Sequence, residues 1–478
     1  MSPMATAVAK LFVACPFMLI ASGCGGDASQ TESGEQTVVE SLESSETVSP
    51  SEASESTTLL EPAASGESQT AIPAESNPID ELPSDPFELI DRAISSLEAG
   101  DGEAAFKIAL HAKRLAPEDP DVLFTYARAL AARSRLFEAV RVLDRLAESH
   151  PETRLFAIGQ TAEWLVEMGD AEAAEKRYRE LRREVDDASQ SFVDHQLVMM
   201  FMRQGERFKA AEVIRELCKT GDVNLSELIL LLKVGIPLPE SEKLFGEFEP
   251  VTDLGIVMQS ISRGDWQEAL QKLERPNASD QVLAMRGRVY AEQNQSNALR
   301  EWIEAEYANV ADRNDAKFAW AIHQLANQQG AQAAKVLSEV LLRDPTNVAA
   351  YEGLADALVL LDQTESASAA KMRAGQIQQS QQIGAQFASG SADAVSIQKM
   401  VDLLAGLNRP LESLAWESIA IRFRQSSGQL NEQQAEAAYA DLARRRSEVV
   451  QNKSFELDPE FVLLGIDPNS IESDSPDE

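Results

Sequence analysis

The sequence predicts an all-α protein whose helices come in repeated helix-turn-helix units. Apolar residues make up 44% of the 478 residues but aromatic residues only 6%, so most apolar side chains are small or unbranched and favour helix over strand. A period is also visible, because Ala105 and Ala139 lie 34 residues apart, and so do Pro117 and Pro151. Each alanine falls early in the second helix of a unit. Each proline falls just after that helix, where its missing N–H ends the helix at little cost.

The first 23 residues predict an export signal. Lys10 is their only charged residue, and it precedes an apolar run from Leu11 to Ile20 that ends in small residues. The run is too short to cross a hydrocarbon core of about 30 Å, and Pro16 interrupts it. We therefore expect residues 1–23 to be a cleaved signal peptide and not a transmembrane helix.

The cleavage region Ala21-Ser22-Gly23-Cys24 resembles the lipobox of bacterial lipoproteins. It departs from that pattern at Ala21, where leucine is commoner. The resemblance implies that Cys24 becomes the acylated first residue, that acyl chains anchor the protein in a membrane, and that the protein is exported to the bacterial cell envelope. The alternative is an ordinary secreted protein in which Cys24 has no special role.

Residues 24–85 predict a disordered acidic linker. Between Gly25 and Asp85 there are fourteen acidic residues and no lysine or arginine, among Ser, Thr, Gln, Ala and Pro. Such a segment cannot bury enough apolar surface to offset the entropy lost on ordering. As a flexible coil it would span roughly 45 Å, which suits a tether between a membrane anchor and a folded region.

Residues 86–375 predict the repeat region. Its second unit places large, small and apolar residues at regular positions, namely Leu123, Tyr126, Ala127, Leu130, Ala139, Leu143, Leu146 and Pro151. Two later units repeat Ala321 and Ala333 as Ala355 and Ala367, again 34 residues apart. These positions resemble the tetratricopeptide repeat. The resemblance implies a right-handed superhelical solenoid of antiparallel helix pairs.

The pattern weakens in two places. Between Val223 and Pro250 it breaks, and we expect a short or distorted repeat there. We expect residues 376–452 to form a degenerate repeat followed by capping helices, the last of which starts after Asn431. We expect residues 453–478 to form a disordered acidic tail. Residues 408–417 and 458–465 also resemble, more weakly, the tetratricopeptide region of bacterial ASPIC/UnbV envelope proteins.

Charge and composition narrow the function classes. The formal net charge is −35, from 78 acidic and 43 basic residues, and so negative a surface repels nucleic-acid phosphates. The four histidines lie more than thirty residues apart, with no metal-ligand spacing, and no phosphate loop or nucleophile elbow occurs. We therefore expect no nucleic acid, metal ion or cofactor to bind and no catalytic activity. Cys218 lies in an apolar helical run and is expected to be a packed thiol.

The tetratricopeptide resemblance implies a concave protein-binding surface lined by the first helix of each unit. Carried over position by position, the groove residues are Phe124, Arg128, Glu163, Glu167, His195, Met199, Arg203 and Phe318, with Met202 as a further candidate. We interpret the chain as a non-catalytic, membrane-anchored scaffold or adaptor for unknown protein partners. A structural or assembly subunit of an envelope complex is the alternative, and an enzyme with an unrecognised site is a third hypothesis.

Overall fold

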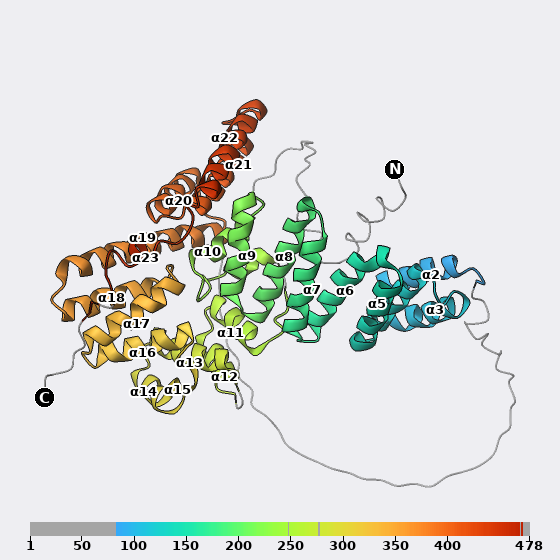
Figure 1. The fold of residues 1–478 in the computed structure, drawn as a ribbon, viewed down its shortest axis with the longest axis horizontal. Coiled ribbons are helices and arrows are strands. Elements are labelled where there is room, and N and C mark those ends of the chain that lie inside the picture. Colours follow the sequence, from blue (N-terminus) through green and yellow to red (C-terminus); the bar gives the residue numbers. More distant parts are fainter. Residues whose placement is uncertain (1–82, 247, 276–277, 469, 472–478) are drawn as a thin grey trace, which may run out of the picture. The chain divides into compact units, whose positions relative to one another are not determined.

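The computed structural model describes residues 83–246, 248–275, 278–468 and 470–471 (Figure 1). Every regular element within these ranges is a helix, so the prediction of an all-α fold is confirmed. The predicted signal peptide, Cys24 and the linker up to residue 82 lie outside the described residues. In the described part of the chain, no helix is both long enough and apolar enough to span a membrane.

Four helix pairs follow one another at the start of the described region, and their first three units begin at residues 86, 120 and 154, which confirms the 34-residue period. A short 3-10 helix, η1 (Pro151–Thr153), precedes the third unit. The pairs are α2 (Pro86–Glu98) with α3 (Gly102–Leu115), α4 (Pro120–Ala132) with α5 (Leu136–Ser149), α6 (Arg154–Glu167) with α7 (Ala171–Glu184), and α8 (Asp187–Gln204) with α9 (Arg207–Thr220).

Local sequence explains where these helices begin and why they pair closely. Asp85 and Asp119 cap α2 and α4, because each side chain accepts a hydrogen bond from a backbone N–H of the first turn. A proline follows each cap, at a position where a helix needs no N–H donor. Ala139 of α5 is fully buried in one cluster with Ala127 of α4. Small side chains at this contact let the two helices of a unit approach.

The region where the repeat pattern breaks contains one helix and an extended segment instead of a helix pair. Helix α10 (Leu225–Leu232) begins with a capping box at Asn224, and the chain then runs through residues 233–240 to the 3-10 helix η2 (Ser241–Phe245). We call residues 225–246 the insert. Its apolar side chains from Leu228 to Leu232 are fully buried, so the insert is part of the core and not a surface loop.

A second series of helices follows the insert. Helices α16 and α18 begin 34 residues apart, and so do α17 and α19, as the alanine spacing predicts. The series comprises α11 (Asp253–Ser262), α12 (Trp266–Leu273), α13 (Asp280–Glu292), α14 (Ser296–Ala305), α15 (Tyr307–Val310), α16 (Asn314–Ala326), α17 (Gly330–Arg343), α18 (Val348–Leu360) and α19 (Thr364–Ala388).

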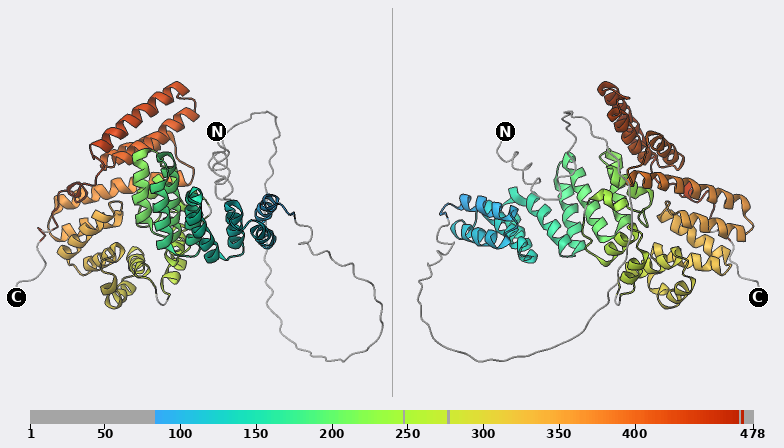
Figure 2. Two further views of the ribbon diagram at one scale, coloured as in Figure 1. Left: turned by 45° about the vertical axis from the view of Figure 1, so that its right-hand side comes forward. Right: turned by 180° about the vertical axis from the view of Figure 1, so that it is seen from behind.

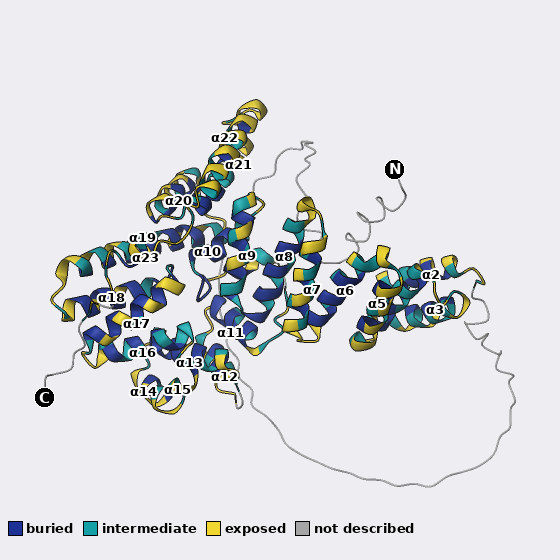
Figure 3. Ribbon diagram, in the orientation of Figure 1, coloured by how far each residue is buried: buried dark blue, intermediate teal, exposed yellow. Residues whose placement is uncertain are grey.

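The C-terminal helices α20 (Ala394–Gly406), α21 (Pro410–Ser426) and α22 (Glu432–Gln451) return to the first series (Figure 2). Helices α21 and α22 both contact α9, and α20 and α21 share a buried cluster with α9 and α10 that includes Met400, Leu404 and Trp416. Asn431 caps α22 through a capping box, as expected. Figure 3 shows α22 exposed along most of its length, with Ala435 and Leu442 as its buried residues.

The prediction of a disordered tail from residue 453 is wrong for the part of it that is described. Residues 459–462 form the short helix α23 (Pro459–Val462), and Val462 and Leu463 are buried in the core of the second series. The Tyr351 hydroxyl on α18 donates a hydrogen bond to the carbonyl oxygen of Val462 at 2.9 Å. The apolar run at residues 461–464 therefore finds a surface to cover, in spite of its acidic surroundings. Residues 472–478 lie outside the described residues.

Buried polar contacts hold the insert between the two series of helices. On one side Arg207 of α9 donates from Nε to the carbonyl oxygen of Val234 at 2.9 Å. On the other side the N–H of Val234 donates to the Thr346 hydroxyl at 3.0 Å. Gln381 of α19 donates from Nε2 to the carbonyl oxygens of Leu232 at 3.1 Å and Thr346 at 2.8 Å. These bonds satisfy the backbone of an extended segment that has no helix or sheet partner of its own.

Arg288 of α13 lies at the centre of a buried cluster of charges beside the insert, and its side chain is 2% exposed. Its Nη1 donates to Asp315 at 2.6 Å and its Nη2 to Glu292 at 3.5 Å. At Gly235 a Cβ would lie 2.3 Å from Arg288 Nη1 and 2.7 Å from Asp344 Oδ2, so only glycine lets the insert pass this close to the charges. Arg288, Glu292, Asp315 and Asp344 are called the junction charges below.

Candidate protein-binding site

The structure brings three of the expected groove residues together on consecutive first helices. Glu163 and Glu167 lie one turn apart on α6 and interact electrostatically with each other. Glu167 also interacts electrostatically with Arg203 of α8. Desolvation and the negative charge of Glu163 raise the pKa of Glu167, while Arg203 acts in the opposite direction. Gln160 donates a hydrogen bond from Nε2 to Glu163 at 3.2 Å. We call Glu163, Glu167 and Arg203 the mixed-charge face.

Arg203 also has a structural contact that the sequence did not reveal. Its Nε donates to the carbonyl oxygen of Glu249 at 3.0 Å, and its own carbonyl oxygen accepts from the N–H of Val251 at 3.0 Å. Arg203 therefore holds the segment that leads into α11. A substitution of Arg203 would alter this segment as well as the mixed-charge face, so Glu167 is the cleaner residue to change.

The other expected groove residues on these helices are partly covered. Phe124 and Arg128 on α4 and Met199 on α8 are all half-buried. Phe124 packs against the apolar cluster of α4 and α5. Met202 is buried in the core of the first series and is not a groove residue. On α8, the three steps from Met199 to Met202 turn a side chain by about 300°, so the two side chains point about 60° apart.

Phe318 is also not a groove residue. It is 1% exposed and lies in the core of the second series, with the Arg288 guanidinium 5.4 Å from its ring centroid. Helix α16 contacts α13, α14, α15, α17 and α18. Because neighbours cover most of its circumference, the position that would face a groove in an isolated helix pair faces another helix here.

His195 forms a contact between two helices. Its Nδ1 lies 2.6 Å from Oε1 of Glu227 in the insert, and the Glu227 side chain is only 3% exposed. Desolvation acts to lower the pKa of His195, but the hydrogen bond to Glu227 and the negative charges of Glu227, Asp222 and Asp194 outweigh it and raise the pKa. His195 therefore links α8 and α10 through an ion pair, and its groove role stays a prediction.

This ion pair predicts a pH-dependent contribution to stability. Because the pKa of His195 is higher in the folded state than in the unfolded state, the pair contributes fully below the unfolded value of about 6.5 and is lost as pH rises through the folded pKa. His195→Gln keeps a hydrogen-bonding side chain but cannot titrate. Urea unfolding of both proteins from about pH 5.5 to 8.5 should show that the wild-type advantage shrinks with increasing pH. Parallel curves for the two proteins would contradict the assignment.

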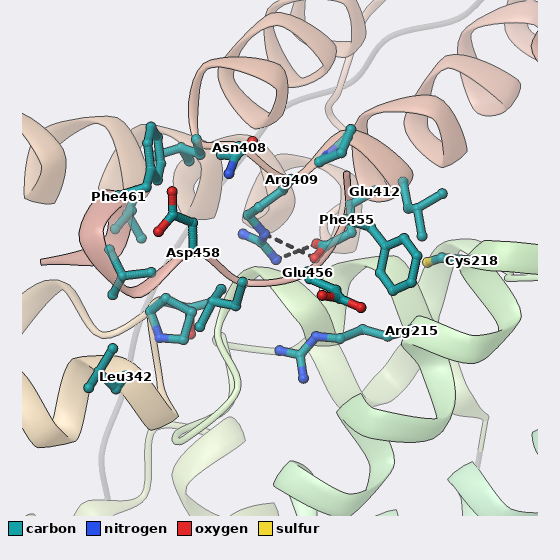
Figure 4. Close-up of a pocket in the computed structure, with 18 of the residues that line it drawn as sticks. Arg215, Cys218, Leu342, Asn408, Arg409, Glu412, Phe455, Glu456, Asp458 and Phe461 are labelled. Atoms are coloured by element: carbon teal, nitrogen blue, oxygen red, sulfur yellow. Dashed lines mark hydrogen bonds and ion pairs between the residues drawn. The ribbon is translucent and has the colours of Figure 1, made fainter. Parts of the chain in front are cut away.

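A cavity of about 400 Å³ lies between α9, α17, α19, the start of α21 and the C-terminal segment (Figure 4). Sequence reasoning missed it, since its walls come from segments far apart in the chain. Cys218 lines it and is buried, as expected of a packed thiol, and burial raises the pKa of this thiol well above its usual value. The one sequence signal was the alternation of acidic and apolar residues between Phe455 and Phe461.

No group of His, Cys, Asp or Glu side chains within the described ranges is arranged to hold a metal ion. The thiol of Cys218 has no histidine among the residues that line its cavity. The mixed-charge face and the cavity present charged and apolar side chains.

No family model and no curated protein matches the chain. Similar solved structures include a tetratricopeptide repeat protein from Parabacteroides merdae, with 12% identity, a TM-score of 0.19 and coverage of 75% of this chain and 98% of that one. The Cut9–Hcn1 hetero-tetramer of APC/C is similar at 14% identity, with a TM-score of 0.24 and coverage of 78% and 86%.

The P58(IPK) tetratricopeptide domain is a third similar structure, with 12% identity, a TM-score of 0.22 and coverage of 77% of this chain and 99% of that one. Such low TM-scores support no argument about function. The assignment of a helix-turn-helix repeat fold rests instead on the 34-residue spacing of the helix pairs in the chain itself.

Proposed function

We propose that this chain is a lipid-anchored, non-catalytic scaffold that binds other proteins in the bacterial cell envelope. The observation that carries the proposal is the mixed-charge face, where Glu163, Glu167 and Arg203 lie together on consecutive first helices of a repeat fold. Stacked helix pairs present such faces as extended binding surfaces. A segment with charges of both signs, or an apolar helix flanked by charges, complements this face.

The first prediction from this proposal concerns Glu167, which is exposed near the end of α6. Glu167→Lys should lower partner recovery about tenfold, the effect of losing about 1.4 kcal/mol of binding free energy. The measurement is affinity purification from detergent-solubilised membranes, followed by mass spectrometry. Glu148→Lys is the matched control, because Glu148 is also exposed, lies near the end of α5, and undergoes the same change in charge near a helix C-terminus. Unchanged partner recovery with a folded Glu167→Lys protein would exclude the mixed-charge face as the binding surface.

The second prediction concerns the anchor. Cys24→Ala should release the protein from membranes, because the acyl chains would have no thiol to carry them and each buried methylene contributes about 0.8 kcal/mol to membrane binding. Membrane fractionation measures the release, and metabolic labelling with an acyl-chain analogue measures the modification directly. Cys15→Ala is the control, since this residue lies within the predicted signal peptide and should leave labelling intact. A wild-type protein that takes up no label would contradict the proposal.

A further inference from the structure

The walls of the cavity carry an excess of positive charge that is unusual for this chain. Excluding the C-terminal segment, the charged residues lining it are Arg215, Lys219, Arg343, Arg373 and Arg409 against Glu212, Glu216 and Glu412. The whole chain has a net charge of −35, so these walls, which we call the cradle, form a local basic site. Such a site attracts acidic segments.

Two of these cations have no acidic partner. Arg215 forms no ion pair or hydrogen bond with any described residue, and Arg373 interacts with the Tyr351 hydroxyl instead of with a carboxylate. Desolvation lowers the pKa of Arg373, and the interaction with Tyr351 opposes this effect. Figure 4 shows Arg215 on the α9 wall, facing the C-terminal segment that carries Glu456. A basic wall with unpaired arginines is arranged for an anionic ligand.

The C-terminal segment, residues 454–464, occupies the mouth of this cradle and is held at its two ends. Lys219 Nζ lies 4.6 Å from the centroid of the Phe455 ring, and the Arg373 guanidinium lies 4.1 Å from that of Phe461. Both distances are typical of cation–π contacts. Beyond Phe461, Val462 is buried. The two aromatic side chains, six residues apart, are therefore the anchors of the segment.

The middle of the segment fits the cradle poorly. Glu456, Leu457 and Asp458 are all exposed, and Leu457 retains 47% of its accessible surface. The ion pair of Glu456 is with Lys453, at 4.0 Å, and Asp458 caps the backbone of α23. Within the described residues, neither carboxylate reaches a cation of the cradle, and the cavity beneath them stays open. A segment held by its ends over an open cavity can be displaced by a ligand that fills the cavity.

We propose that residues 454–464 are a built-in, displaceable ligand of the cradle, and that the cradle binds in their place an extended acidic segment of another protein that carries two aromatic residues. The aromatic residues would contact Lys219 and Arg373, and the intervening carboxylates would reach Arg215. This proposal does not depend on the mixed-charge face, which lies on other helices.

The test uses the full-length mature chain in detergent and a fluorescent peptide of residues 453–466 as the probe. Wild type should bind the peptide weakly, because its own tail competes at an effective concentration on the order of mM. The variant Phe455→Ala/Phe461→Ala, which weakens the tail but leaves the cradle intact, should bind the peptide at least tenfold more tightly. Adding Lys219→Glu and Arg373→Glu should abolish that gain, and so should a peptide in which both phenylalanines are alanine. Phe455→Ala alone, away from the buried Val462, keeps the test valid if the double variant unfolds.

Several outcomes would overturn the proposal. One is a weakened-tail variant that binds the peptide no more tightly than wild type does. Another is a peptide without phenylalanines that binds equally well. A concentration-dependent dimer that Phe461→Ala abolishes would assign the cradle to the tail of a second copy of this chain instead. Because Glu167→Lys should leave peptide binding unchanged, a failure of the cradle and a failure of the mixed-charge face are distinguishable.

Discussion

Replacing Arg288 with methionine is expected to lower the free energy of unfolding by about 3–5 kcal/mol. Methionine fills much of the same space, but it removes the buried cation that pairs with Asp315 and Glu292 and that lies beside Asp344. The cost arises from the uncompensated carboxylates more than from the lost contacts. Urea or guanidinium unfolding, followed by circular dichroism, measures it.

Two further variants show whether the junction charges are the cause. Adding Asp315→Asn to Arg288→Met should restore part of the lost stability, because it removes one of the buried negative charges. Arg92→Met removes an exposed arginine that pairs with Glu88 on α2 and should cost less than about 1 kcal/mol. An Arg288→Met protein as stable as Arg92→Met would mean that the junction charges are solvated.

The second large effect is expected at Trp416, which is fully buried where α21 meets α9 and α10. Trp416→Ala should destabilise the protein by about 3–5 kcal/mol, because the indole is lost and a void remains. Its ring centroid lies 4.9 Å from that of Phe387 at the end of α19, so the void would loosen the return of the C-terminal helices to the first series. Thermal unfolding with a tertiary probe such as near-ultraviolet circular dichroism measures the loss.

Trp416→Phe separates packing from polarity at this site. The indole Nε1 has no hydrogen-bond partner in the described part of the protein, so phenylalanine removes an unsatisfied donor while keeping the ring contact with Phe387. Its cost should be about 1–2 kcal/mol. Val395→Ala on α20 is the control, because Val395 is 74% exposed and its change should lie within about 0.5 kcal/mol. A Trp416→Ala protein as stable as the Val395→Ala control would show that α21 does not depend on this contact.

The groove residues show how far family positions can be carried over without a structure. Glu163, Glu167 and Arg203 lie together because α6 and α8 keep the regular spacing of first helices. Phe318 does not face a groove, because the neighbours of α16 enclose it, and His195 pairs with Glu227 of the insert. The position of a residue on a helix sets the direction in which its side chain points. Which helix or loop the side chain meets depends on the tertiary structure.

The sequence by itself determined the all-helical fold, the 34-residue period of the helix pairs and the starts of helices such as α2, α4 and α22. These features depend on residues within one or two turns of each other: small side chains at a repeated position, a capping Asp or Asn, and a proline beside it.

Only the tertiary structure decided that α20–α22 return to α9, that the insert is buried, and that the tail covers a basic cradle. Arg446 illustrates the reason: it lies in a run of three arginines typical of an exposed face, yet its Nη1 donates to the carbonyl oxygen of Thr220 at the end of α9, at 3.0 Å. Contacts between segments so far apart are set by which surfaces remain unpaired after the repeats have stacked. Local sequence periodicity carries no information about that choice.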